Sequence, residues 1–104
     1  MSVPDFGRFS DPALLILASL AGGEKHGYSM MEDIEAISGI KLGPGTLYGA
    51  LSRLEEHGFI EIVETTDRRK PYKLTAKGLT TLESTLEKMH SFTQTGLKRL
   101  GDSG

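Results

Sequence analysis

The segment Leu42–Ile60, LGPGTLYGALSRLEEHGFI, decides the fold prediction. It begins with a Gly-Pro-Gly turn and closes at a His-Gly pair, so it predicts a helix of about three turns with well-defined ends. At about 100° per residue, Leu47, Leu51 and Leu54 lie on one side of this helix together with Ala50. That side is expected to face a hydrophobic core.

The opposite side of the same helix carries Tyr48, Gly49, Ser52 and Arg53. A glycine inside a helix costs about 1 kcal/mol relative to alanine, and on an outward side no core packing explains it. Two interpretations stay open. The side is an ordinary solvated surface with an incidental glycine, or a large partner such as the DNA major groove approaches the backbone at Gly49.

Two further helices are predicted upstream. Asp11 and Pro12 begin the first, and the sequence ALLILASLA that follows is apolar on nearly all sides, which predicts burial. The second begins near His26 and runs to about Ile37. Its stripe of apolar positions comprises Met30, Ile34 and Ile37. A second and third helix joined by a short connection containing glycine form a helix-turn-helix pattern.

A β-hairpin is predicted downstream, with strands over Ile60–Glu64 and Pro71–Leu74. Its basic residues are Arg68, Arg69, Lys70 and Lys73. Such a run is often a solvated loop. Directly after a helix-turn-helix, however, it is in the position of a wing, which favours contact with phosphates.

A last helix is predicted from Ala76 to about Leu100, with Thr75 as its cap. It would span about 37 Å, whereas a domain of about 100 residues has a radius of gyration of only ~13 Å. Its apolar stripe therefore predicts packing on a second copy, unless the helix folds back or frays after Met89. The expected dimer interface comprises Leu14, Leu17, Leu79, Leu82, Leu86, Met89, Phe92 and Leu100. The predicted division is an arm at 1–11, a winged helix-turn-helix domain at 12–75, a dimerisation helix at 76–100 and a tail at 101–104.

Four stretches together carry a family resemblance: LLILASL at 14–20, HGYSM at 26–30, GPGTLYGALSRLEEHGFIE at 43–61 and RRKPYKLTAKG at 68–78. They resemble the PadR family of winged-helix transcriptional regulators, over about residues 12 to 80. The tail resembles that of the shorter members, which keep one C-terminal helix for dimerisation. Many members have proline where this chain has Gly49. Short multidrug-responsive members can stack planar ligands on an interface tryptophan, which this chain lacks.

The resemblance implies a dimeric repressor that binds double-stranded DNA at a near-palindromic operator and releases it when a small molecule or another signal arrives. We expect the third helix to enter the major groove and the wing to engage flanking phosphates. The expected DNA-binding residues are Tyr28, Lys41, Thr46, Tyr48, Gly49, Ser52, Arg53, Arg68, Arg69, Lys70 and Lys73. An effector cavity at the dimer interface would involve Phe6, Met89 and Phe92, although such residues are more often simply core.

The composition bounds the other function classes. The net charge of −2 counts against nucleic-acid binding unless a local basic patch exists, so a winged-helix module for protein–protein contact without DNA binding stays an alternative. The chain has no cysteine, and its three histidines lie in separate elements without metal-ligand spacing. No catalytic motif is present. We therefore expect no enzyme activity, no cofactor, no membrane span and a cytoplasmic location.

Overall fold

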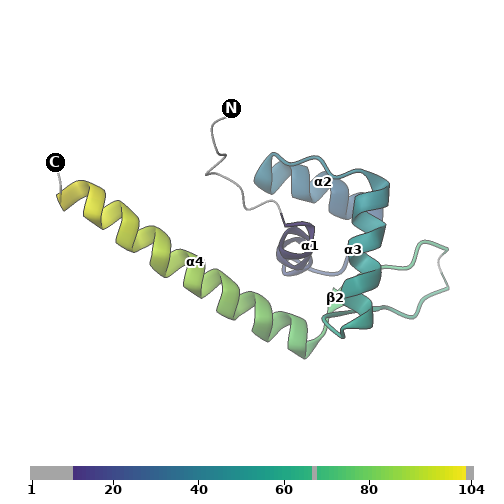
Figure 1. Cartoon of the computed structure of the whole chain (residues 1–104). Helices are drawn as coiled ribbons and strands as arrows, with labels where there is room; N and C mark the ends of the chain where they lie inside the picture. Colours follow the sequence, from purple (N-terminus) through teal and green to yellow (C-terminus); the bar gives the residue numbers. More distant parts are fainter. Residues whose placement is uncertain (1–10, 67, 103–104) are drawn as a thin grey trace.

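The computed structural model describes residues 11–66 and 68–102. In chain order the elements are α1 (Pro12–Leu20), α2 (Gly27–Ser38), α3 (Pro44–Glu56), β1 (Ile60–Ile62), β2 (Tyr72–Leu74) and α4 (Ala76–Asp102). Figure 1 shows α1 in the middle of the body, with α2 and α3 beside it and α4 leaving as a long straight arm. The predicted fold class, mainly α with a small β-hairpin in a winged helix-turn-helix arrangement, is confirmed.

The helix ends follow from local chemistry. The Asp11 carboxylate accepts a hydrogen bond of 3.0 Å from the Ala13 N–H, with Pro12 at the first helical position. Helix α2 ends at Gly39, whose φ of 74° lies in the left-handed region that favours glycine. Gly58, with φ of 79°, performs the same turn between α3 and β1. These turns set the directions in which α3 and the hairpin leave.

The core lies between α1, α2, α3 and the first turns of α4. Its largest fully buried apolar side chains are Ile16, Met30, Ile34, Leu47, Leu51 and Ile60. The predicted inward side of the third helix is confirmed, because all four of its apolar residues are buried. The predicted stripe of the second helix is wrong at its last position: Ile37 is 56% exposed. No residue of α2 after Ile34 is buried, so its last turn lies beyond the packed surface.

The hairpin pairs β1 with β2 in antiparallel register, Ile60 opposite Leu74, Glu61 opposite Lys73 and Ile62 opposite Tyr72. The first strand ends two residues earlier than predicted. A third segment joins this sheet, because Lys25 and Tyr72 exchange backbone hydrogen bonds of 3.1 and 2.9 Å. The loop between α1 and α2 is thereby attached to the root of the wing.

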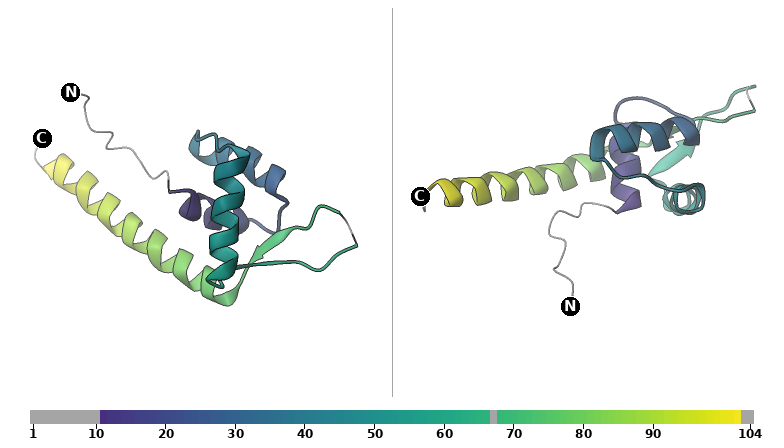
Figure 2. Two further views of the ribbon diagram at one scale, coloured as in Figure 1. Left: turned by 45° about the vertical axis from the view of Figure 1, so that its right-hand side comes forward. Right: turned by 90° about the horizontal axis from the view of Figure 1, so that it is seen from above.

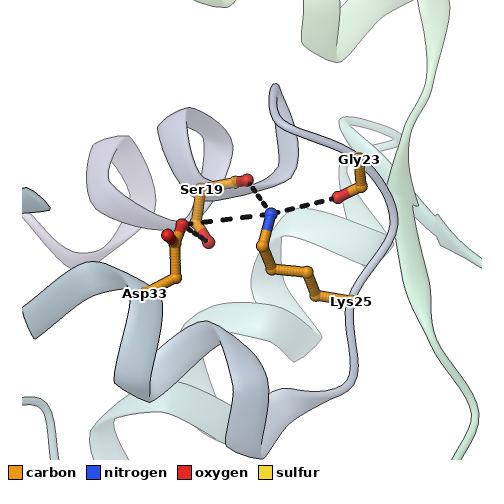
Figure 3. A network of polar contacts seen from close by, with 4 residues as sticks. All are labelled: Ser19, Gly23, Lys25 and Asp33. Atoms are coloured by element: carbon orange, nitrogen blue, oxygen red, sulfur yellow. Dashed lines mark hydrogen bonds and ion pairs between the residues drawn. The ribbon is translucent and has the colours of Figure 1, made fainter. Parts of the chain in front are cut away.

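Lys25 also holds this loop through its side chain, as Figure 3 shows. Its Nζ donates a hydrogen bond of 2.6 Å to the Ser19 carbonyl and lies 3.9 Å from Asp33 Oδ2. The buried Ser19 hydroxyl donates a bond of 2.7 Å to the same carboxylate. Burying a polar side chain is tolerated when its hydrogen bonds are made. Lys25 and Asp33 therefore hold α1 and α2 together.

Helix α4 has 27 residues and spans about 40 Å. Its start is fixed to the body as predicted, because the Thr75 hydroxyl donates 2.6 Å to the Gly58 carbonyl and accepts from the Gly78 N–H. Beyond its first turns it runs away from the body, and both views of Figure 2 show it extending opposite to the hairpin loop. The radius of gyration of 16.0 Å reflects this elongation. The helix continues to Asp102 rather than fraying after Met89.

Two residues of the expected dimer interface belong to the core of the same chain instead. Leu17 is 5% exposed and Leu82 is 2% exposed in the single chain. The first turns of α4 lie against α1, so these leucines are covered without a partner. Leu14 is half-buried, and the remaining expected interface residues are exposed.

Candidate nucleic-acid interface

The outward side of α3 is open, as the sequence predicts. Tyr48 is 48% exposed, Ser52 and Arg53 are exposed, and Gly49 is half-buried between them. A Cβ added at Gly49 would lie 3.8 Å from Arg53 Nη1, which is an ordinary contact. Nothing within the described chain therefore requires glycine at this position. Either a partner approaches the backbone here, or the glycine is incidental.

Tyr48 does not project freely into solvent. Its ring end lies against the backbone of Gly27, at the first position of α2, so that any side chain on Gly27 would overlap the Tyr48 hydroxyl. Gly27 is buried by this contact. The close approach of α2 and α3 thus fixes the direction of the tyrosine. The HGY stretch contains Gly27, but the sequence alone does not reveal this role.

The wing and the two helices meet around a hollow of about 360 Å³. It is lined by His26, Gly27, Tyr28, Tyr48, Ile62, Arg68, Arg69, Lys70 and Tyr72. The structure therefore brings three basic wing residues together with Tyr28 and Tyr48. Tyr72 is an addition to the predicted set; burial, followed by the nearby Glu55 carboxylate and Tyr48, raises the pKa of its hydroxyl. Tyrosine hydroxyls and three cations in one concave surface suit a phosphate backbone.

Two further predicted residues lie near the start of α3. Lys41 is in the turn between α2 and α3, Thr46 is in the first turn of α3, and both are exposed. Gly43 caps α3 without a side chain, so no side chain of the cap accepts from the first N–H groups of the helix. Free N–H groups at a helix N-terminus attract anions. Thr46 lies within this first turn, where its hydroxyl can add to such a contact.

Lys73 lies apart from the other wing cations. Its Nζ is 3.3 Å from Glu61 Oε1, directly opposite in the strand register. Half-exposed ion pairs of this kind contribute little stability, but the Glu61 carboxylate offsets the positive charge of Lys73. Lys73 does not line the hollow with Arg68, Arg69 and Lys70. The structure thus separates it from the predicted basic group.

Among residues 11–66 and 68–102, no group of three or more acidic or histidine side chains could hold a metal ion. None of the helices in this part of the chain is both long and apolar enough to cross a membrane.

The fold combines a helix-turn-helix whose third helix is open with a hairpin that carries basic residues on the same side. This combination defines the winged helix-turn-helix class of DNA-binding domains. The chain belongs to the transcriptional regulator PadR-like family, whose sequence model matches residues 16–84. The members of this family are DNA-binding transcription regulators rather than enzymes.

Solved structures of the family share the architecture. A PadR family transcription regulator from Clostridium difficile superposes with a TM-score of 0.75 at 26% identity, covering 86% of this chain and 97% of that one. RosR from Halobacterium salinarum superposes with a TM-score of 0.70 at 26% identity, covering 84% of this chain and 79% of that one.

Two curated relatives match by sequence. A 37.1 kDa uncharacterised protein in transposon TN4556 of Streptomyces fradiae is 45% identical over 76 residues, which are 73% of this chain and 22% of that protein. The transcriptional activator GvpE2 of Halobacterium salinarum is 33% identical over 67 residues, 64% of this chain and 34% of that protein. The chain therefore spans about a fifth and a third of the length of these relatives.

Proposed function

We propose that the protein is a sequence-specific DNA-binding regulator that acts as a homodimer, most simply as a repressor on a near-palindromic operator. The observation that carries the proposal is the single surface formed by the open side of α3 and the basic wing residues around the hollow that they share with Tyr28. The family membership supports the general class of DNA-binding regulators.

In this proposal α3 enters the major groove, which is about 12 Å wide and admits one helix. Ser52 and Arg53 face base edges together with Tyr48, and Gly49 lets the backbone come close. Arg53 is suited to a guanine edge or to a phosphate.

The residues around α3 hold the DNA backbone. Tyr28, Lys41 and Thr46 contact phosphates beside the groove, where the first N–H groups of α3 also point. The wing residues Arg68, Arg69 and Lys70 engage phosphates on the other side. Lys73 is the weakest of the predicted DNA contacts, because Glu61 already offsets its charge.

The proposed dimer interface is the apolar side of α4. Its exposed members are Leu79, Leu86, Met89, Phe92, Leu97 and Leu100. Phe92 is 80% exposed, and large apolar side chains in such a row mark an association surface. A twofold arrangement lets the same surface serve both copies, with the half-buried Leu14 of α1 at its edge. Leu17 and Leu82 are excluded, since each chain buries them by itself.

Regulation has two open directions. Steric repression needs only that the bound dimer blocks polymerase. Activation is the second candidate, favoured by the similarity to GvpE2, which is named a transcriptional activator. An effector cavity at the interface would involve Met89 and Phe92, whereas Phe6 lies outside the described residues.

The proposal is tested by selecting bound duplexes from a random pool while the mass of the protein in solution is measured. We expect twice the mass of the chain and a sequence with two inverted half-sites whose centres are one DNA turn apart, about 34 Å. The rival, a module for protein contact only, predicts no enrichment of any sequence at any salt concentration.

A further inference from the structure

A second hollow, of about 570 Å³, shares Tyr28 with the basic hollow and lies between the outward side of α2 and the turn that leads into α3. Its volume is in the range of small-molecule sites, about 300–1,000 Å³. Met31, Leu42 and Pro44 give it apolar walls, and the Tyr28 ring, 63% exposed, stands at its edge. None of its lining residues in the described part of the chain comes from the wing or from α4.

Two carboxylates make this hollow chemically different from the basic one. Tyr28, Glu32 and Glu35 are spaced i, i+4 and i+7 along α2, so they share one side of the helix. Neither glutamate forms an ion pair with a residue that the structure describes. The third acid of this helix, Asp33, is instead held by Lys25 and Ser19, as Figure 3 shows.

The charge balance of the hollow selects the sign of a ligand. Among the described residues that line it, Lys41 on the turn is the one cation, against two carboxylates. Glu32 and Glu35 repel a DNA phosphate, so within this hollow only Tyr28 and Lys41 belong to the proposed phosphate contacts. A cation placed at the carboxylates lies beside the Tyr28 ring, whose face attracts positive charge.

We propose that this hollow binds a small organic cation with an aromatic or alkyl body, and that the bound cation competes with DNA. The ammonium group would lie at Glu32 and Glu35, and its apolar body against Met31 and Leu42. The competition follows from Tyr28, which lines both hollows. Only this competition rests on the proposed DNA-binding function. The binding itself is a property of the free protein.

The first experiment measures binding without DNA. The full chain, labelled with ¹⁵N, is titrated with benzyltrimethylammonium, and benzyl alcohol serves as the neutral probe of similar body. We expect saturable shifts of the amides at 28–35 and 41–45, with at least tenfold weaker binding of the alcohol. Equal binding of both probes, or shifts confined to other residues, would overturn the site.

Matched variants distinguish the effect of these two carboxylates from that of the overall negative charge of the protein. Glu32→Gln with Glu35→Gln should weaken benzyltrimethylammonium binding at least tenfold. Glu83→Gln with Glu87→Gln removes two exposed acids, four positions apart on α4, and should leave binding unchanged. Both pairs are exposed, so thermal unfolding should show intact folds. A Glu32/Glu35 variant that is folded and binds like the wild type would contradict the proposal.

The second experiment tests competition, with a duplex obtained by selection and sodium chloride at equal ionic strength as the control. Benzyltrimethylammonium should weaken DNA binding by the wild type more than sodium does, and this difference should vanish in Glu32→Gln with Glu35→Gln. If the cation binds but DNA affinity follows ionic strength alone, the competition is wrong. If no duplex is bound at all, the proposed function fails and the first experiment still decides the cation site.

Discussion

The Tyr48 ring of α3 lies directly on the backbone of Gly27 at the start of α2, where no side chain fits between them. This contact joins the supporting helix to the proposed reading helix, at the surface that is proposed to face DNA. Tyr48 is half-exposed and yet held in one direction, so its hydroxyl is positioned before any partner arrives. Such preorganisation reduces the entropy lost on binding.

Gly27→Ala tests this relationship. The added methyl group overlaps the tyrosine, so either the ring turns away or the helices separate, and overpacking of this kind costs about 1–3 kcal/mol. We expect lower thermal stability together with weaker binding to the selected duplex. The double variant Gly27→Ala with Tyr48→Ala should recover stability but not specific binding. Full affinity in Gly27→Ala would show that the contact does not position Tyr48 for DNA.

Gly49→Ala is the matched opposite case. Here the methyl group meets only an ordinary contact with Arg53, and alanine favours the helix by about 1 kcal/mol. We expect a more stable protein that binds its operator less tightly, because the methyl group occupies the space of the approaching groove. Stability comes from chemical denaturation and affinity from fluorescence anisotropy. A variant with both properties improved would leave Gly49 without a role in DNA approach.

Arg68→Ala with Arg69→Ala tests the wing. Each phosphate contact contributes about −0.9 to the slope of log K against log salt concentration on duplex DNA. Loss of both arginines should therefore reduce the magnitude of that slope by up to about 2. It should weaken binding to the selected duplex and to random duplexes alike. Lys88→Ala with Lys98→Ala, two exposed cations on α4, is the control and should leave the slope unchanged. Equal slopes in the wing variant and the wild type would remove the wing from the interface.

Phe92→Glu and Leu82→Ala separate association from folding. Phe92 is exposed on the single chain, so the glutamate introduced there should convert the dimer to a monomer and halve the mass measured in solution. The helix content of dilute protein should change little. Leu82 is buried in the chain's own core, and its truncation should cost about 2–5 kcal/mol of unfolding free energy. Analytical ultracentrifugation and denaturant unfolding distinguish the two effects. A dimer that persists in Phe92→Glu would place the interface elsewhere.

The pKa of Tyr72 gives a pH dependence. Burial raises it above the ordinary value of 10.0, so the folded state holds the phenolic proton more tightly than the unfolded chain. The associated stability is fully present below pH ~10 and is lost as pH rises through the folded pKa. Alkaline unfolding should begin at higher pH in Tyr72→Phe, which cannot ionise. Identical alkaline profiles for both proteins would contradict the raised pKa.

The sequence predicted much of the fold because local signals carry it. The period of Leu47, Leu51 and Leu54 identified the buried side of α3, and the Thr75 cap marked the start of α4. Both depend on residues a few positions apart. The same reasoning erred at Ile37, because a helical period indicates a side of the helix but not where the neighbouring element stops.

Relationships between distant segments could not be predicted. The Lys25–Tyr72 bridge, the Glu61–Lys73 pair and the Gly27–Tyr48 contact depend on strand register and on the crossing of two helices. The apolar stripe of α4 likewise did not reveal that Leu82 turns toward its own core whereas Leu86 and Met89 stay exposed. For the candidate site, the sequence therefore supplied most of the residues and the structure supplied their grouping.

The most direct test of the central claim compares the affinity of the wild-type protein for its selected duplex with that for a scrambled duplex of equal length, across a range of salt concentrations. If α3 is the reading helix, affinity should decrease steeply with salt for both duplexes, and the selected sequence should be preferred by a factor of about 10³ or more. Ser52→Ala with Arg53→Ala should also remove most of that preference while the scrambled duplex is affected less. Equal affinity for both duplexes in the wild type would contradict the assignment of α3 as the reading helix.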